Sequence, residues 1–584
     1  MDPSTGSRSS IEDLSSRQEC TSGWTFRLRA LTLWESPVVE VKSLTEVELK
    51  FLVPTVARVN LATEMARSSA TLDRLSLAAM YLDTDDRRLA REGIAWRLRR
   101  EGRRWIQTLK AGSTNALERF EHEVVRPDAS HDASQHAGTS VGDHLIALLR
   151  RANADGVEPK VRFQTKVRRT TRRVRTRGAV VEVAYDEGRL LAGGSTQRIC
   201  EIEFELRAGS TAAMLVLVER WRKRFGLIYD PRSKAERGDL LADGKPFPPL
   251  RKAGRPRFSI DATATEAFGA VLDECLAQVT RNAIGLIEGA PALRTEHVHQ
   301  LRVGIRRMRS AVSCFKGWTN DPPAELVDGL RSLFATLGIA RDSDVLGSGV
   351  VAELAKVGAP PLVLPTAVGG CDPVEAVRAS EAHRTLLAWI AWRAALNEEP
   401  EGESGATETG PEGKDAQSTE SEAQSSNDRP PKGESLAPQN SVGKSSAIHP
   451  VRGGASTFHG NIERRLRKWH LRFIADWKSF DGLDEDSLHA LRKRIKRQRY
   501  AVEFFAPVLR RRKVERYLSA VAPIQERMGE LNDLFVARTQ YQLFIEANPA
   551  AWFAIGWLTA RIAEVRAQAK PELERLAKVE PPAL

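Results

Sequence analysis

The segment Glu46-Val-Glu-Leu-Lys-Phe-Leu-Val53 alternates charged and apolar side chains at its start. Because successive side chains of a β-strand point to opposite faces, Glu46, Glu48 and Lys50 would share one face, and the apolar residues between them the other. Carboxylates two residues apart on a strand offer hard oxygen ligands that suit Mg²⁺ or Mn²⁺. Taken alone, the pattern is more typical of an amphipathic strand with a solvated face.

The same alternation recurs in later segments. Charged side chains share one strand face at Arg97 and Arg99, at Lys110, at Glu182 and Asp186, and at Glu201, Glu203 and Glu205. Several such strands indicate a barrel with a charged interior, since burying many charges is costly unless they are paired or coordinate an ion. Arg and Lys are the side chains that phosphate oxygens require. The set therefore predicts a site for a complex of a metal ion and a polyphosphate.

A second charged pattern has the period of a helix. Positions spaced three, four and three residues apart lie along one stripe of a helix, and two segments have this spacing: His299, Arg302, Arg306 and Arg309, and then His489, Arg492, Lys496 and Arg499. A basic stripe is often only a solvated face. Like charges one turn apart repel, however, so keeping the stripe twice favours an anion bound along it.

The two stripes belong to an internal repeat. Val298-His-Gln-Leu-Arg-Val-Gly-Ile-Arg-Arg-Met-Arg309 aligns without a gap with Leu488-His-Ala-Leu-Arg-Lys-Arg-Ile-Lys-Arg-Gln-Arg499. Further on, Gly338–Val345 aligns with Gly529–Val536. The nearly constant separation indicates a duplicated helical unit.

Composition divides the chain into regions, and 584 residues exceed the roughly 250–300 at which single cores stop growing. We expect an α+β N-terminal domain, an antiparallel β-barrel, over residues 41–245, followed by an all-α domain of duplicated helical bundles over 262–580. Residues 1–40 are expected to be disordered and 246–261 to form a linker. A disordered acidic insert is expected at 397–450.

The overall charge favours a polyanionic partner. Lys and Arg number 88 against 76 Asp and Glu, which gives a net charge of +12. The five cysteines show no spacing typical of a zinc site or a disulfide framework, and neither a signal peptide nor a membrane-spanning apolar run is visible. We therefore expect a cytoplasmic protein without membrane association. No P-loop or G-x-S-x-G nucleophile motif occurs.

The charged strands resemble those of CYTH domains, the triphosphate tunnel metalloenzymes. The matching motifs, in family order, are E-V-E-L-K, Y-L-D-T-D at Tyr81–Asp85, W-R-L-R, T-L-K, V-A-Y-D-E-G at Val183–Gly188, C-E-I-E-F-E-L and R-S-K-A-E-R-G at Arg232–Gly238. One departure is Asp239, which follows the last motif where family members often have an aromatic residue.

This resemblance implies a function and the residues that perform it. The family relation implies hydrolysis of inorganic triphosphate to pyrophosphate and phosphate, with Mg²⁺ or Mn²⁺ as cofactor. Metal ligands would be Glu46, Glu48, Glu201 and Glu203, with Asp186 and Glu205 as further candidates. Phosphate ligands would be Lys50, Arg97, Arg99, Lys110, Arg169 and Lys234. Glu46, Glu48 and Lys50 would be catalytic.

The repeated helices resemble a CHAD domain, the α-helical module with conserved histidines that commonly follows a CYTH domain. The resemblance is carried by the paired V-H-Q-L-R and L-H-A-L-R segments and by A-R-D-S-D-V with its counterpart L-N-D-L-F-V. It implies two four-helix bundles whose basic stripes bind inorganic polyphosphate.

Other functions remain open at this point. The substrate could instead be thiamine triphosphate or a nucleoside triphosphate, or ATP that is cyclised as in class IV adenylyl cyclases, because the named residues would contact only phosphates and metals. A polyphosphate-binding scaffold without turnover is a different possibility, opposed by the complete set of carboxylates and lysines. Nucleic-acid binding is disfavoured, since Tyr500 is the one aromatic residue next to a stripe. The oligomeric state is not predicted.

Overall fold

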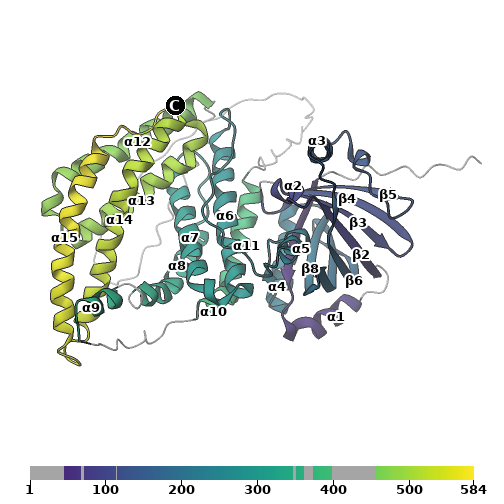
Figure 1. The fold of residues 1–584 in the computed structure, drawn as a ribbon, viewed down its shortest axis with the longest axis horizontal. Coiled ribbons are helices and arrows are strands. Elements are labelled where there is room, and N and C mark those ends of the chain that lie inside the picture. Colours follow the sequence, from purple (N-terminus) through teal and green to yellow (C-terminus); the bar gives the residue numbers. More distant parts are fainter. Residues whose placement is uncertain (1–44, 68–71, 113–114, 346–349, 361–371, 397–454) are drawn as a thin grey trace, which may run out of the picture. The chain divides into compact units, whose positions relative to one another are not determined.

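The computed structural model describes residues 45–67, 72–112, 115–345, 350–360, 372–396 and 455–584 (Figure 1). The segment 1–40 and the insert 397–450, both predicted to be disordered, lie outside the described residues. Within the described ranges, all β-strands lie between Thr45 and Tyr229. From Ala264 onward, the regular elements are helices.

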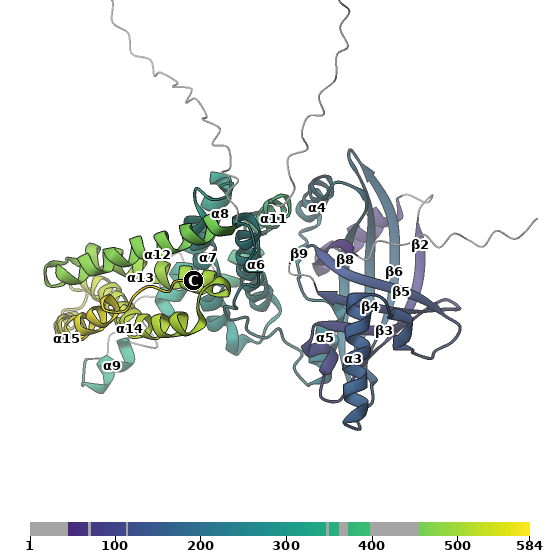
Figure 2. The same cartoon turned by 90° about the horizontal axis from the view of Figure 1, so that it is seen from above.

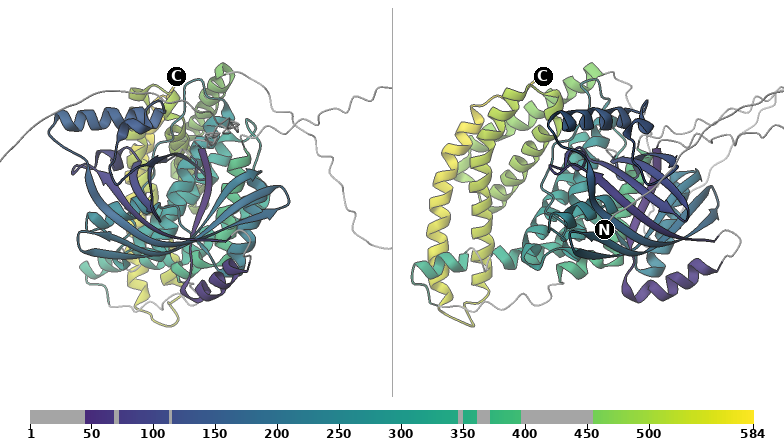
Figure 3. Two further views of the ribbon diagram at one scale, coloured as in Figure 1. Left: turned by 90° about the vertical axis from the view of Figure 1, so that its right-hand side faces the viewer. Right: turned by 45° about the vertical axis from the view of Figure 1, so that its right-hand side comes forward.

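The N-terminal region is an antiparallel β-barrel. Its strands are β1 (Thr45–Leu52), β2 (Asp73–Asp83), β3 (Ile94–Glu101), β4 (Arg104–Gly112), β5 (Glu118–Arg126), β6 (Lys160–Thr176), β7 (Ala179–Ala192) and β8 (Ser195–Gly209). They pair in the order β5-β4-β3-β2-β6-β7-β8-β1, and β5 also pairs with β1, which closes the sheet. The short strand β9 (Ile228–Tyr229) pairs antiparallel with the end of β1. Figure 3 shows the long, curved strands, and the predicted barrel is confirmed.

Helices α1 (Arg58–Ala66), α2 (Arg88–Arg91), α3 (Ser140–Ala154) and α4 (Thr211–Phe225) cover apolar parts of the outer face of this barrel. Helix α5 (Lys234–Ala242) packs instead on residues that face the interior, with Leu241 in one apolar cluster with Phe163 and Val167 of β6. Phe51 of β1 and Phe204 of β8 meet edge to face with ring centroids 5.8 Å apart, and Trp221 of α4 packs on Phe204 at 5.8 Å. Trp96 of β3 belongs to one apolar cluster with Leu145 and Leu148 of α3. Because strands alternate, the charged positions between these apolar residues face the interior.

The C-terminal region is helical. Its first half contains α6 (Ala264–Glu288), α7 (Arg294–Phe315), α8 (Ala324–Val345), α9 (Val351–Lys356), α10 (Pro373–Arg378) and α11 (Ser380–Ala395); its second half contains α12 (Ala455–Lys478), α13 (Glu485–Phe505), α14 (Arg511–Gln542) and α15 (Ala551–Ala577). In the second half, α12 packs on α13 and α15, and α14 on α13 and α15; Figure 2 shows these helices side by side. The predicted all-α character of this region is confirmed.

The repeated helices α7 and α13 are amphipathic. Leu301 and Ile305 of α7 and their counterparts Leu491 and Ile495 of α13 are fully buried, as expected for the apolar seam beside each basic stripe. The two helices also pack against each other and so join the halves. None of the helices in the described ranges combines the length and the apolar content needed to traverse a bilayer.

Candidate active site

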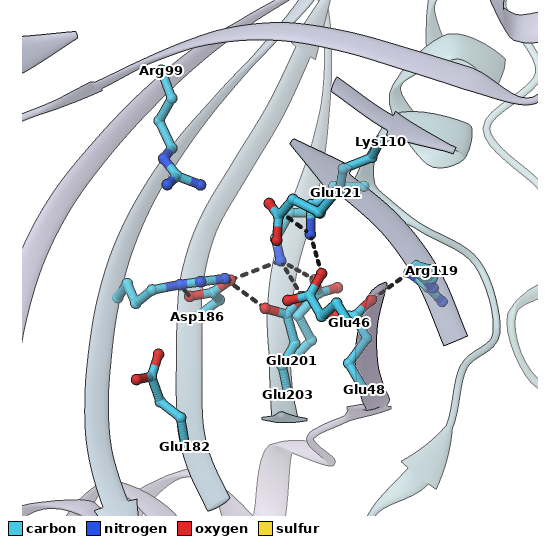
Figure 4. A network of polar contacts seen from close by, with 12 residues as sticks. Glu46, Glu48, Arg99, Lys110, Arg119, Glu121, Glu182, Asp186, Glu201 and Glu203 are labelled. Atoms are coloured by element: carbon cyan, nitrogen blue, oxygen red, sulfur yellow. Dashed lines mark hydrogen bonds and ion pairs between the residues drawn. The ribbon is translucent and has the colours of Figure 1, made fainter. Parts of the chain in front are cut away.

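Strand pairing sets the predicted charged residues side by side inside the barrel. Lys50 of β1 lies opposite Glu203 of β8. Asp186 of β7 is flanked by Glu201 of β8 on one side and Arg169 of β6 on the other. Residues directly opposite each other on paired strands project to the same face, so all five side chains enter the interior. Figure 4 shows the carboxylates of Asp186, Glu201 and Glu203 pointing toward one another.

These three carboxylates form what we call the acidic cluster. Asp186, Glu201 and Glu203 each contribute an oxygen atom to a group in which all the oxygens lie within 4.8 Å of one another. The ammonium of Lys234 lies 2.7, 2.5 and 2.7 Å from oxygens of the three residues. Arg169 donates hydrogen bonds of 2.7 Å to Asp186 and 2.6 Å to Glu203. Two predicted phosphate ligands thus contact three predicted metal ligands directly.

The ion pairs keep the acidic cluster charged despite its burial. Burial acts to raise the pKa of Glu203, but Lys234 and Arg169 hold that pKa well below its ordinary value. The same two cations outweigh burial at Asp186 and lower its pKa. In return, Asp186, Glu201 and Glu203 overcome burial and hold the pKa of Lys234 well above its ordinary value. Ionised carboxylates are the form that binds metal ions.

Lys50 is a buried cation without a partner. Its side chain is 3% exposed, and its Nζ atom makes no hydrogen bond or ion pair with any described residue. Burial lowers the pKa of Lys50. An unpaired buried ammonium is costly, and an anionic ligand in the barrel would remove that cost. The buried carboxylate oxygens and this orphaned cation together fit a divalent metal ion bound with a phosphate chain.

A second group of charges surrounds Glu46 and Glu48 of β1. Lys110 of β4 lies 2.8 Å from Glu46 and 3.2 Å from Glu121, and Arg119 lies 2.5 Å from Glu48. Burial raises the pKa of Glu46 to about 9; Lys110 opposes this rise, while Glu48, Glu121 and Glu205 add to it. The six predicted metal ligands therefore fall into two groups. Asp186, Glu201 and Glu203 form the acidic cluster, and Glu46, Glu48 and Glu205 lie outside it.

The remaining predicted residues also line the barrel. Arg97 of β3 lies 3.7 Å from both Glu121 and Glu123, and Arg99 lies 3.2 Å from Glu123. Glu205 of β8 pairs with Arg207 at 2.5 Å. Figure 4 shows Arg99 and Lys110 directed toward the interior from their separate strands.

Three interior residues of β5 were missed by sequence reasoning. Arg119, Glu121 and Glu123 alternate in Glu118-Arg-Phe-Glu-His-Glu123 with the same period of two that identified the other strands. The alternation of charged and other residues could therefore have identified this strand. What the sequence did not show is that β5 pairs with β1, which brings Arg119 opposite Glu46.

Helix α5 carries Lys234 into the barrel and is fixed at both ends. The side chain of Ser233 caps its first turn by accepting a hydrogen bond from the backbone N–H of Glu236. At its other end, Asp239 and Asp243 form ion pairs with Arg87 and Arg162. Asp239 thus stands where family members often have an aromatic residue, and its ion pairs hold α5 in place. We call the ion pairs of Asp239 and Asp243 with Arg87 and Arg162 the ionic clamp.

The structure also places the two basic stripes of the helical region. Arg306 of α7 interacts electrostatically with Arg492 and Lys496 of α13, so cations of the two stripes meet where these helices pack. Arg499 pairs with Glu503 at 3.3 Å, and His489 Nδ1 lies 3.0 Å from Asn532 of α14. Arg302 and Arg309 lie near Phe334 of α8, and His299 belongs to the same helix, α7.

Comparison with known protein families identifies both regions. The family model of the CYTH domain matches residues 44–238, and the model of the CHAD domain matches residues 270–542. The chain contains a CYTH domain followed by a CHAD domain. The barrel with its charged interior is the CYTH domain, and the repeated basic helices lie in the CHAD domain.

Individual relatives cover parts of the chain. An inorganic triphosphatase from Haemophilus influenzae is 29% identical over 204 residues, which is 34% of this chain and 55% of that protein, so the match spans little more than half of its length. The crystal structure of a CHAD domain from the plant Ricinus communis shares 26% identity, covering 57% of this chain and 99% of that one, with a TM-score of 0.41. A Hippeastrum protein described as a candidate adenylyl cyclase with a dominant triphosphatase activity shares 17% identity over 34% of this chain and 96% of that one, with a TM-score of 0.25.

Proposed function

We propose that the CYTH domain is a metal-dependent triphosphatase that hydrolyses inorganic triphosphate to pyrophosphate and phosphate. The observation that carries this proposal is the enclosure of the acidic cluster and the unpartnered Lys50 in one closed barrel. The CYTH family match and the resemblance to an inorganic triphosphatase support hydrolysis of a triphosphate in general.

The residues present divide the work of binding and hydrolysis. Asp186, Glu201 and Glu203 would hold Mg²⁺ or Mn²⁺, with Glu46, Glu48 and Glu205 as further candidate ligands. A bound metal ion would neutralise negative charge on the phosphate chain. The phosphate oxygens would bind to Lys50, Arg97, Arg99, Lys110, Arg169 and Lys234.

Hydrolysis then needs a water molecule aligned with the terminal phosphorus. A side-chain oxygen of Glu46 or Glu48 would orient this water. The water oxygen forms a bond to phosphorus, the phosphoanhydride bond breaks with its electrons passing to pyrophosphate, and the proton of the water leaves to solvent. No covalent enzyme intermediate is required, which agrees with the lack of a nucleophile motif in the sequence.

The test is phosphate release from tripolyphosphate, with thiamine triphosphate and ATP as alternative substrates and cyclic AMP as an alternative product. We expect turnover of tripolyphosphate that needs Mg²⁺ or Mn²⁺ and falls on the order of 100-fold in Glu48→Gln and in Lys50→Met. Lys166→Met is the matched control, because Lys166 is exposed on the outer face of β6. Metal-independent turnover, or variants as active as the wild type, would reject the proposal.

We also propose that the CHAD domain binds long-chain polyphosphate. The meeting of Arg306, Arg492 and Lys496 favours this function, because none of the three forms an ion pair with a carboxylate in the described ranges and a cluster of basic groups favours a bound counter-ion. Retention on immobilised polyphosphate should be lost when Arg302, Arg306, Arg492 and Lys496 are changed together to Ala. Retention without any tripolyphosphate turnover would instead favour a non-catalytic scaffold.

A further inference from the structure

Three guanidinium groups of α7 gather around one aromatic ring. The Cζ atoms of Arg302, Arg306 and Arg309 lie 4.2, 5.5 and 5.9 Å from the ring centroid of Phe334 on the adjacent helix α8. The face of an aromatic ring carries partial negative charge and attracts cations. Unlike a carboxylate, the ring does not neutralise them, and it does not compete with phosphate for their N–H donors. Carboxylates of the described ranges form no ion pair with Arg306 or Arg309.

Helix α8 also leaves room for the first of these groups. Gly338 follows Phe334 by about one helical turn and so lies on the same face of α8. A Cβ atom at Gly338 would lie 2.7 Å from Nη1 of Arg302. That same Nη1 atom donates a hydrogen bond of 2.9 Å to the backbone carbonyl of Phe334. Phe334 and Gly338 together form a surface on which Arg302 rests, which we call the arginine seat.

The second half of the CHAD domain lacks this seat. In the aligned repeat, Gln525 of α14 stands in place of Phe334, and Gly529 in place of Gly338. A Cβ atom at Gly529 would meet no atom within 4 Å. The seat is therefore specific to the first stripe, and Gly529 offers an equivalent position without it.

We propose that Phe334 and Gly338 are positioning residues for polyanion binding, which hold Arg302, Arg306 and Arg309 in an array that consecutive phosphates of a polyphosphate chain can bridge. This inference rests on the polyphosphate binding proposed above. Preorganised cations bind more tightly because less side-chain entropy is lost on binding. Neither residue itself contacts the polyanion in this arrangement.

The experiment measures the affinity of the full-length protein for long-chain polyphosphate at several salt concentrations. We expect Phe334→Leu and Gly338→Ala each to weaken binding roughly three- to tenfold and to reduce its salt dependence, while Phe334→Trp, with a better cation-binding face, keeps it. Gly338→Ala is the sharper variant. Alanine favours a helix interior, so its thermal midpoint should equal or exceed that of the wild type even though Arg302 is displaced.

Gly529→Ala is the matched control, with unchanged polyphosphate affinity expected. If the wild type binds polyphosphate and both Gly338→Ala and Phe334→Leu bind it equally well, the positioning role of the arginine seat is rejected. The proposed polyphosphate binding would stand. A wild-type protein that does not bind polyphosphate would overturn the proposed function of the CHAD domain and the seat with it. Weakened binding in Gly338→Ala, with thermal stability retained, supports the seat even if Phe334→Leu folds poorly.

Discussion

Lys496 lies on α13 among other cations. Arg306 of α7 and Arg492 and Arg499 of its own helix act on it electrostatically, and Asp533 of α14 opposes them. Burial, reinforced by Arg306 and Arg492, lowers the pKa of Lys496 to about 6. The free protein therefore holds this side chain largely neutral at neutral pH.

We predict that polyphosphate binding takes up a proton at Lys496. A bound anion raises the pKa again, so affinity should increase as the pH falls from about 9 to about 6 and change little below that. Lys496→Arg, which stays charged, should flatten the profile. The measurement is the dissociation constant at fixed ionic strength across this range. Identical profiles for both proteins would contradict the assignment.

Two contacting histidines of the CYTH domain, His122 and His136, should make its stability depend on pH. Nδ1 of His136 lies 2.9 Å from Nδ1 of His122, and its Nε2 lies 3.0 Å from Nε2 of Gln107. The backbone N–H of Asp132 donates to Oε1 of Gln107, which fixes Nε2 of the amide as a donor. Nδ1 of His136 therefore carries the proton and donates to His122. Protonation of either accepting nitrogen, Nε2 of His136 or Nδ1 of His122, would break this series of hydrogen bonds.

Burial, the neighbouring His122 and Arg126 lower the pKa of His136 to about 4, against the opposing effect of Asp132. A histidine with a depressed folded-state pKa stabilises the fold above about pH 6.5 and loses this contribution as the pH falls toward 4. We predict that the free energy of unfolding of the CYTH domain declines by roughly 1–3 kcal/mol over that interval. His136→Gln should reduce the slope, as measured by urea unfolding of the full-length protein. A slope equal to that of the wild type would assign the acid sensitivity elsewhere.

At the scale of elements, α5 links the outer ionic clamp to the acidic cluster. Lys234 begins this short helix, and Asp239, in its second turn, forms ion pairs with Arg87 and Arg162. Arg87 is the one non-glycine residue with positive φ, 61°, in the described ranges. Such a conformation is costly and persists where its surroundings hold it.

We predict that Asp239→Asn lowers tripolyphosphate turnover about tenfold, because Lys234 is no longer held at the acidic cluster, and lowers stability by roughly 1–3 kcal/mol. Asp155→Asn is the control. Asp155 also pairs with an arginine, Arg88, but is largely exposed and lies outside the clamp. Equal activity of both variants would show that α5 needs no clamp.

Local sequence patterns predicted which charged residues share a strand or helix face, but not which strands and helices lie next to each other. Alternation identified Glu46, Glu48 and Lys50 as one strand face, since each strand encodes its own two faces. The pairing of β1 with β5 is not encoded locally, and Arg119 and Glu121 were missed with it. The helical period likewise identified Arg302 and its stripe, whereas the seat on α8 depends on how two helices pack.

At the scale of the whole molecule, the two proposed activities use different residues. We predict that Arg306→Ala combined with Arg492→Ala weakens polyphosphate retention and leaves the turnover of tripolyphosphate unchanged. Lys50→Met should do the reverse. A variant that combines all three changes should show the sum of both effects, as expected for uncoupled sites. Departure from that sum, measured with both assays on the same preparations, would reveal coupling between the domains.

The closure of the barrel by β1 has a consequence for shortened forms of the chain. This strand holds Glu46, Glu48 and Lys50, and it also fills the gap between β8 and β5. A form that starts after Leu52 would lose these three residues of the proposed active site. It would also expose two rows of unsatisfied backbone groups able to pair with strands of other molecules. A single cut would then remove proposed active-site residues and promote self-association, so the solubility of such a form would report whether β1 is intact.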